Sequence, residues 1–296
     1  MTAADAALTA RFQAARPQLG AVAYRMLGSI DDAQDAVQEA WLRLSQRGAE
    51  GAEGIGNLDA WLTTVVARIC LNTLRARRAH GAEELVAQLP DPIVDATGEF
   101  DPEHQAMLAD AVGLALLVVL DTLPPAQRLA FVLHDVFAVP FDQIAPMVDR
   151  SPEAARKLAS RARQRIHEAD PVPDGDIAAQ HEAVDAFFAA GRSGDFARLV
   201  SLLDPDVVLR GDLGPGAVRT ARGASAVAGL ARSYAGPERE VRAATVNGAA
   251  GAVIFVAGRA SAVMAFLVRD RRIAAIDVLA DPKRIANLDL SAVEKT

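Results

Sequence analysis

The sequence contains few of the residues that build covalent or metal-based sites. Among 296 residues there is a single cysteine, Cys70, which rules out an internal disulfide and any multi-cysteine zinc site. The five histidines are scattered, and no two are spaced four residues apart, the spacing that places two ligands on one helix face. The sequence therefore predicts no metal and no cofactor, and it fits a reducing compartment.

Long hydrophobic runs are also missing. The longest wholly apolar stretch, residues 111–120, is about half the length of a membrane-spanning helix and predicts a buried helix. Residues 1–18 alternate charged and small side chains, without the apolar segment of a secretory leader. Half of the residues are nevertheless hydrophobic, so ordinary cores can form. We expect a cytoplasmic protein of two or three domains.

Positive charge is absent from residues 81–121, which hold nine Asp and Glu residues but no Lys or Arg. On either side the balance reverses. Residues 61–80 contain four arginines and no acid, and residues 150–167 contain six basic residues against Glu153 alone. Two basic helices separated by an acidic connector predict two local DNA contacts. The net charge of −7 predicts weak non-specific DNA binding, because phosphate neutralisation supplies most of that affinity.

The first eighty residues have the apolar spacing of consecutive helices. Gly28 and Ser29 separate the first helix from the second, and the glycine-rich stretch 48–56 ends the second. Asn57 or Asp59 is placed to cap a third helix. This segment predicts a small helical bundle.

Residues 141–167 have the pattern of a helix-turn-helix. A short apolar helix is followed by a tight turn at residues 149–150. Ser151 and Pro152 then supply an N-cap and a proline at the first helical position. The second helix turns small and apolar residues inward and basic residues outward, as a helix that enters the DNA major groove does.

After residue 170 the sequence changes to two amphipathic helices and then short β-rich runs with hairpin turns at 247–248 and 269–272. The predicted fold is multidomain, with two all-α domains followed by an α+β domain. The expected segments are a helical domain 1–80, an acidic linker 81–104, a helix-turn-helix domain 105–169, a linker 170–176, an α+β domain 177–285 and a tail 286–296.

Two parts of the chain resemble the extracytoplasmic-function (ECF) sigma factors of bacterial RNA polymerase. Residues 23–42 and 60–68 are similar to region 2 of these proteins, and residues 129–139, 144–148 and 158–163 are similar to region 4. The resemblance implies an alternative sigma factor that binds core RNA polymerase and directs promoter-specific initiation.

The last 125 residues resemble a SnoaL-type, NTF2-like cone domain, most clearly at residues 195–199 and 204–207. Together the parts resemble the SigJ-type subgroup, which carries this extension and usually lacks a separate anti-sigma partner. Its linker and extension motifs are altered here, to Gln88–Pro92, Asp212–Gly216 and Asp281–Ile285. The resemblance implies that these elements connect the extension to the sigma core. The interdomain regulatory residues expected from it are Leu89, Pro90, Asp91, Pro92, Asp212, Asp281 and Pro282.

The resemblance also implies a role for each helical module. The second helix would contact the polymerase clamp helices, and region 4 would contact the flap. The residues predicted to bind core polymerase are Asp35, Gln38, Glu39 and Arg43, for which a merely solvated face is the alternative. The residues predicted to bind the opened −10 element are Asn57, Trp61, Arg68, Arg75, Arg77 and Arg78. Trp61 could stack on a base, although its apolar stripe favours a core position.

On the second helix of the helix-turn-helix, Arg156, Lys157 and Arg161 are predicted to enter the groove of the −35 element, and Arg150 and Arg163 to contact phosphate. His134 is expected to be a packed core histidine and Cys70 a buried, inert thiol.

Three functions of different classes compete. The first is an initiation factor, not an enzyme, whose cone domain regulates it. The second is a cone-domain enzyme or small-molecule sensor joined to a DNA-binding module, with Asp212 and Asp277 as candidate pocket carboxylates. The third is a regulator that binds duplex DNA without polymerase. The region 2 resemblance disfavours the third, and the weak carboxylate pair disfavours an enzyme.

Overall fold

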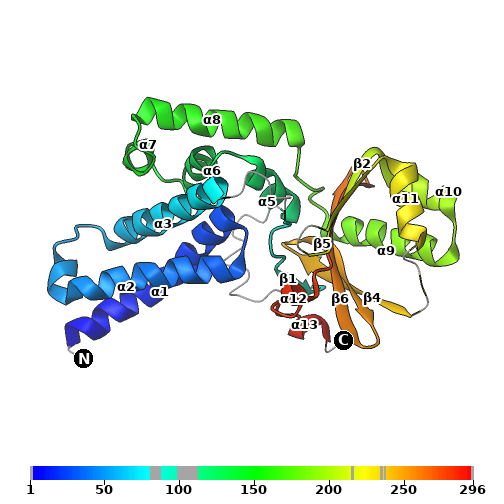
Figure 1. The fold of residues 1–296 in the computed structure, drawn as a ribbon, viewed down its shortest axis with the longest axis horizontal. Coiled ribbons are helices and arrows are strands. Elements are labelled where there is room, and N and C mark those ends of the chain that lie inside the picture. The colour runs from blue at the N-terminus through cyan, green and yellow to red at the C-terminus, as the bar shows by residue number, and fades with distance from the viewer. Residues whose placement is uncertain are drawn as a thin grey trace. The chain divides into compact units, whose positions relative to one another are not determined.

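The structure is a computed structural model that describes residues 3–80, 88–98, 113–214, 217–233, 236 and 238–294. These residues form two compact units (Figure 1). The first unit includes residues 3–80 and 119–169, and the second includes residues 88–98, 113–118 and 170–294.

The first three helices form a bundle in the first unit: α1 (Ala3–Leu27), α2 (Ile30–Glu53) and α3 (Leu58–His80). Gly28 has a φ of 70°, the left-handed conformation that ends a helix at little steric cost, and α2 begins two residues later. Gly48 likewise interrupts α2 with a φ of 68° and a ψ of 176°. Both predicted glycine breaks are therefore present. The core of the bundle is apolar and includes Leu19, Val22, Met26, Leu44, Leu62 and Val66.

The rest of the first unit consists of the end of α5 (Gly113–Thr122) and the helices α6 (Pro125–Phe131), α7 (Phe141–Ile144) and α8 (Pro152–Ala169). A π-helical turn, η1 (Val132–Val136), continues α6, and a 3-10 turn, η2 (Ala145–Met147), continues α7. In the π turn the Val132 carbonyl accepts a hydrogen bond from the Phe137 amide at 3.2 Å. The sequence predicts helix here but not this wider turn.

The second unit is built on a seven-stranded sheet of order β1-β4-β5-β6-β7-β2-β3. Its strands are β1 (Val94–Ala96), β2 (Leu203–Asp212), β3 (Val218–Arg222), β4 (Arg239–Val246), β5 (Ala249–Val256), β6 (Arg259–Arg269) and β7 (Arg272–Leu279). Strands β4 to β7 form the predicted antiparallel meander, whereas β2 pairs with β7 in parallel. The runs at residues 207–210 and 273–279 are predicted as strands, but their parallel pairing is not, and β1 and β3 have no counterpart among the predicted strands.

Helices α9 (Ile177–Ser193), α10 (Phe196–Leu202) and α11 (Ala224–Ser233) lie together on one side of this sheet (Figure 1). Their apolar side chains meet those of the sheet in a core where the rings of Phe187, Phe188 and Phe266 pack edge to face. Two short helices, α12 (Pro282–Ile285) and α13 (Ser291–Glu294), end the described chain. The predicted order of all-α and then α+β domains is confirmed.

Among the described residues, the helices are all too short or too polar to cross a membrane.

Candidate nucleic-acid interface

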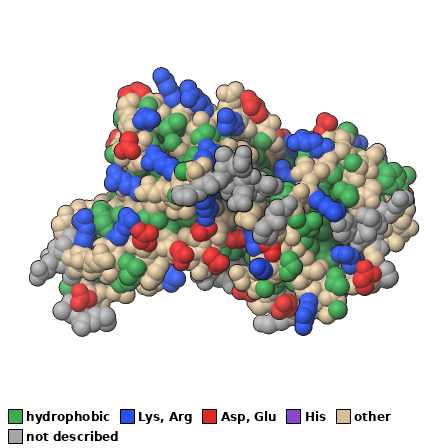
Figure 2. Space-filling model, in the orientation of Figure 1, with side chains coloured by type: hydrophobic (Ala, Val, Ile, Leu, Met, Phe, Trp, Pro, Cys, Tyr) green, Lys and Arg blue, Asp and Glu red, His purple; other side chains and the backbone are tan. Residues whose placement is uncertain are grey.

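Helix α8 presents a dense row of basic side chains. Its buried face is made of three alanines, Ala155, Ala159 and Ala162, which allow α8 to approach α6 and α7 closely. The exposed residues on its other faces include Arg156, Lys157, Arg161, Arg163 and Arg165. Figure 2 shows Lys and Arg side chains gathered along this helix. The result is a positive surface on the second helix of a helix-turn-helix.

The turn before α8 fixes where this helix starts. Asp149 has a φ of 56°, a left-handed conformation in which aspartate is one of the more tolerated non-glycine residues. Ser151 then caps the helix, because its hydroxyl oxygen accepts a hydrogen bond from the Ala154 amide at 3.3 Å. Hydrogen bonds from its own backbone amide and from Ser151 lower the pKa of Glu153, so this exposed carboxylate suits the positive end of the helix.

The residues predicted to contact the −35 element differ in whether another group of the same chain already binds them. Arg163 donates to Asp135 at 3.1 Å, and Arg150 donates to the carbonyl of Asp149 at 2.9 Å. The Arg156 guanidinium carbon lies over the Phe141 ring, 5.4 Å from its centroid. Lys157 and Arg161 make no hydrogen bond or ion pair with any residue that the structure describes. These two side chains are therefore the ones most available for DNA.

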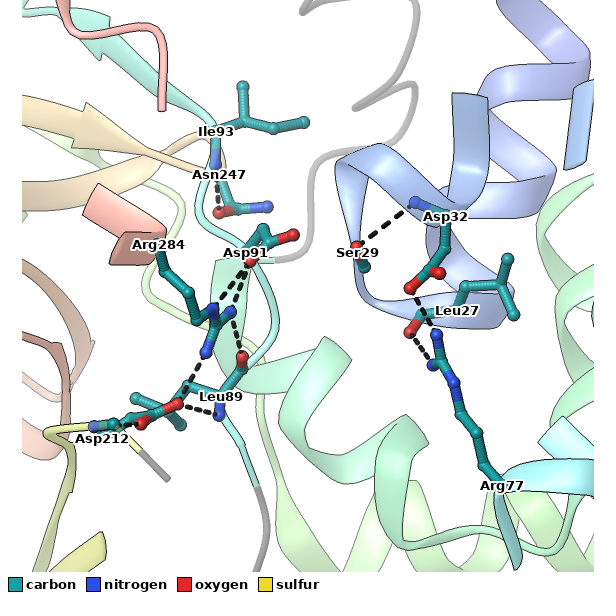
Figure 3. A network of polar contacts seen from close by, with 11 residues as sticks. Leu27, Ser29, Asp32, Arg77, Leu89, Asp91, Ile93, Asp212, Asn247 and Arg284 are labelled. Atoms are coloured by element: carbon teal, nitrogen blue, oxygen red, sulfur yellow. Dashed lines mark hydrogen bonds and ion pairs between the residues drawn. The ribbon is translucent and has the colours of Figure 1, made fainter. Parts of the chain in front are cut away.

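The predicted −10 arginines on α3 are largely engaged within the first unit. Arg68 donates to the Pro146 carbonyl at 3.1 Å, and Arg78 donates to the Leu123 carbonyl at 2.8 Å. Arg77 forms an ion pair with Asp32 and also donates to the Leu27 carbonyl (Figure 3).

Arg75, in contrast, is exposed and has no such bond with a described residue. The sequence marks this basic cluster but does not indicate that three of its members hold helices and turns together.

The start of α3 combines a cap and a half-buried aromatic ring. Asn57 accepts a hydrogen bond from the Ala60 amide at 3.1 Å and is therefore the cap, rather than Asp59. Trp61 is only partly buried, and the Arg47 guanidinium lies 5.2 Å from the centroid of its ring. Trp61 thus belongs neither fully to the core nor fully to the surface.

The predicted polymerase-binding residues share the exposed face of α2. Asp35, Gln38, Glu39 and Arg43 all lie on this face, and Arg43 forms an ion pair with Glu39 one turn away. Leu42, between them, keeps half of its surface exposed. A single exposed leucine is common on protein surfaces, so the shared exposure of the four predicted residues is the feature that bears on binding.

In the second unit the linker is bound against the sheet. Strand β1 forms the edge of the sheet and pairs with β4 in antiparallel register, and the Ile93 amide donates to the Asn247 side chain at 3.1 Å. Leu89, Pro90, Pro92 and Ile93 are buried. Residues 94–96 of the acidic linker therefore add a strand to the sheet of the α+β domain.

One arginine joins this linker to two other parts of the second unit. Arg284, on α12, donates to the Leu89 carbonyl and to Asp212 at 2.6 Å each, and it forms an ion pair with Asp91 (Figure 3). The Leu89 amide donates to the same Asp212 carboxylate at 3.1 Å. We call these four residues, Leu89, Asp91, Asp212 and Arg284, the linker clasp.

The two predicted pocket carboxylates lie away from the apolar core, which is a correction. Asp277 alternates along β7 with Ile276 and Val278, which face the core, so its side chain lies on the opposite face of the sheet. There Arg210 binds it at 2.5 and 3.0 Å. Burial raises the pKa of Asp277, and Arg210 acts in the opposite direction.

Asp212 lies on the same face as Asp277, because it alternates with the core residue Leu209 along β2, and Arg284 binds it there. The two carboxylates therefore each face an arginine rather than an enclosed cavity in the core.

The remaining predicted regulatory residues, Asp281 and Pro282, form the start of α12, the helix that carries Arg284. Asp281 caps α12 by accepting a hydrogen bond from the Lys283 amide at 2.9 Å, and Pro282 is the first residue of that helix. Sequence patterns do not identify two residues that hold the linker, Arg284 and Asn247. The available signals in the sequence were the altered motif Asp281–Ile285 and the Asn-Gly turn. Neither indicates which residue Arg284 or Asn247 binds.

Two other side chains that can react chemically, Cys70 and His134, lie in packed parts of the first unit. Cys70 is fully buried, and desolvation raises its pKa to about 12, so the thiol is protonated at neutral pH. His134 is half-buried rather than fully packed in the core. No group of three or more His, Cys, Asp or Glu side chains within the described ranges is arranged to hold a metal ion.

Comparison with known proteins places these features in a family. The family description Sigma-70 region 2 matches residues 11–80, and Sigma-70, region 4 matches residues 113–166. The chain is 40% identical over 298 residues to the ECF RNA polymerase sigma factor SigJ of Mycobacterium tuberculosis, covering 94% of this chain and 93% of that protein. It is 32% identical to the probable ECF RNA polymerase sigma factor SigI of the same species, with 94% of each chain covered.

The similarity to ECF sigma factors extends to the fold of a solved structure. The crystal structure of the Mycobacterium tuberculosis extracytoplasmic function sigma factor SigJ matches with a TM-score of 0.74 and 37% identity, covering 95% of this chain and 99% of that one. Similarity thus extends through both helical modules and the α+β domain. The chain belongs to the extracytoplasmic-function RNA polymerase sigma factors, which bind core RNA polymerase and direct promoter-specific transcription initiation.

Proposed function

We propose that α8 reads the −35 element through Arg156, Lys157 and Arg161. The observation that carries this proposal is the exposed basic row on the second helix of the helix-turn-helix, in which Lys157 and Arg161 have no hydrogen-bonding partner among the described residues. Arginine and lysine donate to guanine O6 and N7 in the major groove, and each good contact supplies about 1–3 kcal/mol of discrimination. Arg150 and Arg163 would contact phosphate beside it.

The −10 element would be held by α3 and the loop before it. Arg75 is free to contact phosphate, whereas Arg68 and Arg78 each donate to a main-chain carbonyl from the other half of the first unit. Each of these two exposed arginines uses one nitrogen for its carbonyl bond, so its remaining N–H groups are available to DNA phosphate. Asn57 and Trp61 at the helix start would hold an extruded base, with the exposed part of the Trp61 ring as the stacking surface.

The exposed face of α2 would bind the clamp helices of core polymerase, with the flap contacting region 4. Support comes from the exposure of all four predicted residues, Asp35, Gln38, Glu39 and Arg43, on one face of α2. Because core polymerase and promoter DNA are the partners, we place the protein in the cytoplasm.

The α+β domain would regulate initiation from within the chain, without a separate anti-sigma factor and without catalysis. The linker clasp supports this role, since it binds the segment that connects the two promoter-reading modules. The pairing of Asp212 and Asp277 with arginines disfavours an enzyme, which needs a carboxylate free to exchange protons.

The clasp can be tested with the variant Arg284→Ala and the matched control Arg259→Ala, an exposed arginine on β6. We expect Arg284→Ala to speed amide hydrogen exchange in residues 88–98, because the Leu89 carbonyl and Asp91 lose their donor. The amount of transcript made with core RNA polymerase, from duplexes with a randomised promoter region, should also change in Arg284→Ala. A rise would make the clasp inhibitory, and a fall would make it activating.

The control Arg259→Ala should change neither measurement. Faster exchange in the linker with unchanged transcription would contradict regulation through the clasp. If the unaltered chain supported no promoter-dependent transcript, the initiation role itself would fail.

A further inference from the structure

The π turn before the helix-turn-helix directs two consecutive side chains toward the helices that follow it, Asp135 toward α8 and His134 toward α7. His134 and Asp135 both belong to η1, in which the wider helical turn shifts the facing of the residues relative to an α-helix. Asp135 accepts a hydrogen bond from Arg163 of α8 at 3.1 Å. His134 reaches α8 through an intermediate ring, that of Phe141 on α7.

Three side chains form a stack at the start of α8. The rings of His134 and Phe141 are stacked, with centroids 3.8 Å apart and planes 28° from parallel. The Arg156 guanidinium carbon lies over the same Phe141 ring at 5.4 Å from its centroid. Phe141 is 9% exposed, so its ring is held by the core while Arg156 remains exposed. A rigid aromatic face thus supports a flexible, solvent-exposed cation.

The His134 ring is itself fixed by a hydrogen bond. Its Nδ1 lies 3.1 Å from the Val139 carbonyl oxygen. A carbonyl oxygen only accepts, so Nδ1 carries the proton and donates. Ala138, between the two residues, has a φ of 53°, and the Val139 amide donates back to the Leu133 carbonyl at 2.8 Å. The turn therefore holds the ring plane against which Phe141 is stacked.

We propose that His134 and Phe141 are positioning residues that orient the Arg156 guanidinium for base recognition. An unrestrained arginine loses much of its rotamer freedom when it binds a base. An aromatic ring that covers one face of the guanidinium removes part of that freedom beforehand and leaves the N–H edge exposed. Bidentate recognition of guanine uses this edge, so the stack favours the geometry that discriminates between bases.

The same turn assigns a different role to Arg163. Its ion pair with Asp135 holds one nitrogen of Arg163 against η1 and leaves its other N–H groups for phosphate, whereas the ring stack leaves the whole N–H edge of Arg156 exposed. Burial raises the pKa of Asp135, and Arg163 acts against that rise. The π turn thereby separates an oriented arginine, Arg156, from an anchored one, Arg163.

This inference rests on the proposed contact between Arg156 and the −35 element, and the experiment separates the two. The probe is a library of duplexes randomised over the upstream promoter element, bound to the full chain in complex with core RNA polymerase and read by sequencing. Arg156→Ala identifies the base pair that this arginine reads. At that position, we expect Phe141→Leu to lower the preference about two- to fivefold, the effect of one exposed cation–ring contact.

Further variants show whether the effect passes through Arg156. Phe141→Leu should have no additional effect at this position in the Arg156→Ala background. Phe141→Tyr keeps the ring face and should retain the preference, which separates the stack from a loss of folding. His134→Gln keeps a donor for Val139 but has no ring, so a smaller loss at the same position is expected. Asp135→Asn, which releases Arg163, should leave that position unchanged.

Loss of the same preference in Arg156→Ala and Phe141→Leu, with recovery in Phe141→Tyr, supports the inference. A preference that is intact in Phe141→Leu but lost in Arg156→Ala overturns the positioning role and leaves the base contact standing. An unchanged preference in Arg156→Ala overturns the proposed base contact and the positioning role together.

Discussion

At the scale of single residues, arginine does most of the connecting in this protein. Arg284 joins three separate segments of the second unit, and Arg210 holds a buried carboxylate. In the first unit, Arg128 is 2% exposed, and its Nε donates to the Arg25 carbonyl at 2.8 Å. The guanidinium suits these positions because it offers five donors in a fixed plane and stays charged when buried.

Arg128 gives a direct test of this role. We expect Arg128→Ala to reduce the free energy of unfolding of the first unit by about 2–4 kcal/mol, because the Arg25 carbonyl and Asp121 lose their donor and a cavity forms. Arg78→Ala, which removes a bond near the surface, should cost less than about 1.5 kcal/mol. Chemical denaturation measures both variants. Equal losses would show that burial of Arg128 contributes nothing beyond one hydrogen bond.

At the scale of elements, the sequence predicts the positions of helices and strands better than their local geometry. The glycine breaks at Gly28 and Gly48, the cap at Ser151 and the Asn247-Gly248 turn follow from residue type, because few other residues adopt those conformations or offer those acceptors. The π turn has no such marker. Its apolar residues continue the helical pattern of α6, and the wider turn becomes apparent only in the structure, where α1 and α7 pack against it.

Ala138 ends that turn in a strained conformation, which gives a prediction for the element. Its φ of 53° is unfavourable for a residue with a Cβ, so Ala138→Gly should raise the free energy of unfolding by about 0.5–1 kcal/mol. The identical change in a helix, Ala154→Gly in α8, should lower it by about 1 kcal/mol. Thermal unfolding of the two variants gives the comparison. A decrease in both would mean that the backbone at position 138 is not strained in solution.

At the scale of the whole molecule, the distribution of charge matters more than its sum. The net charge is −7, yet α8 has five Lys and Arg residues against two Glu, and α3 has four Arg residues against one Asp. An acidic surface elsewhere repels the DNA backbone, so the chain avoids tight non-specific binding while keeping two local contacts.

This arrangement predicts how duplex DNA binding depends on salt. Binding of the free chain to a duplex of arbitrary sequence should be weak at physiological salt and should tighten steeply as salt is lowered. Arg161→Ala should reduce the slope of log affinity against log salt by about one, because one phosphate or groove contact with its counterion is lost. Fluorescence anisotropy over a salt series measures the slope. The control Arg259→Ala should keep the original slope, and a slope that is the same in all three proteins would exclude α8 as the binding surface.

The sequence by itself determined the family, the order of the domains, the helix-turn-helix and the two basic helices, because each depends on residues that are close together in the chain. Only the tertiary structure decided which arginines are engaged and where the linker lies. The Leu89 amide and its acceptor Asp212 are 123 residues apart, and the Leu89 carbonyl and Arg284 are 195 apart. Local patterns specify local backbone geometry, whereas a buried arginine takes its partner from whichever segment the fold brings within reach.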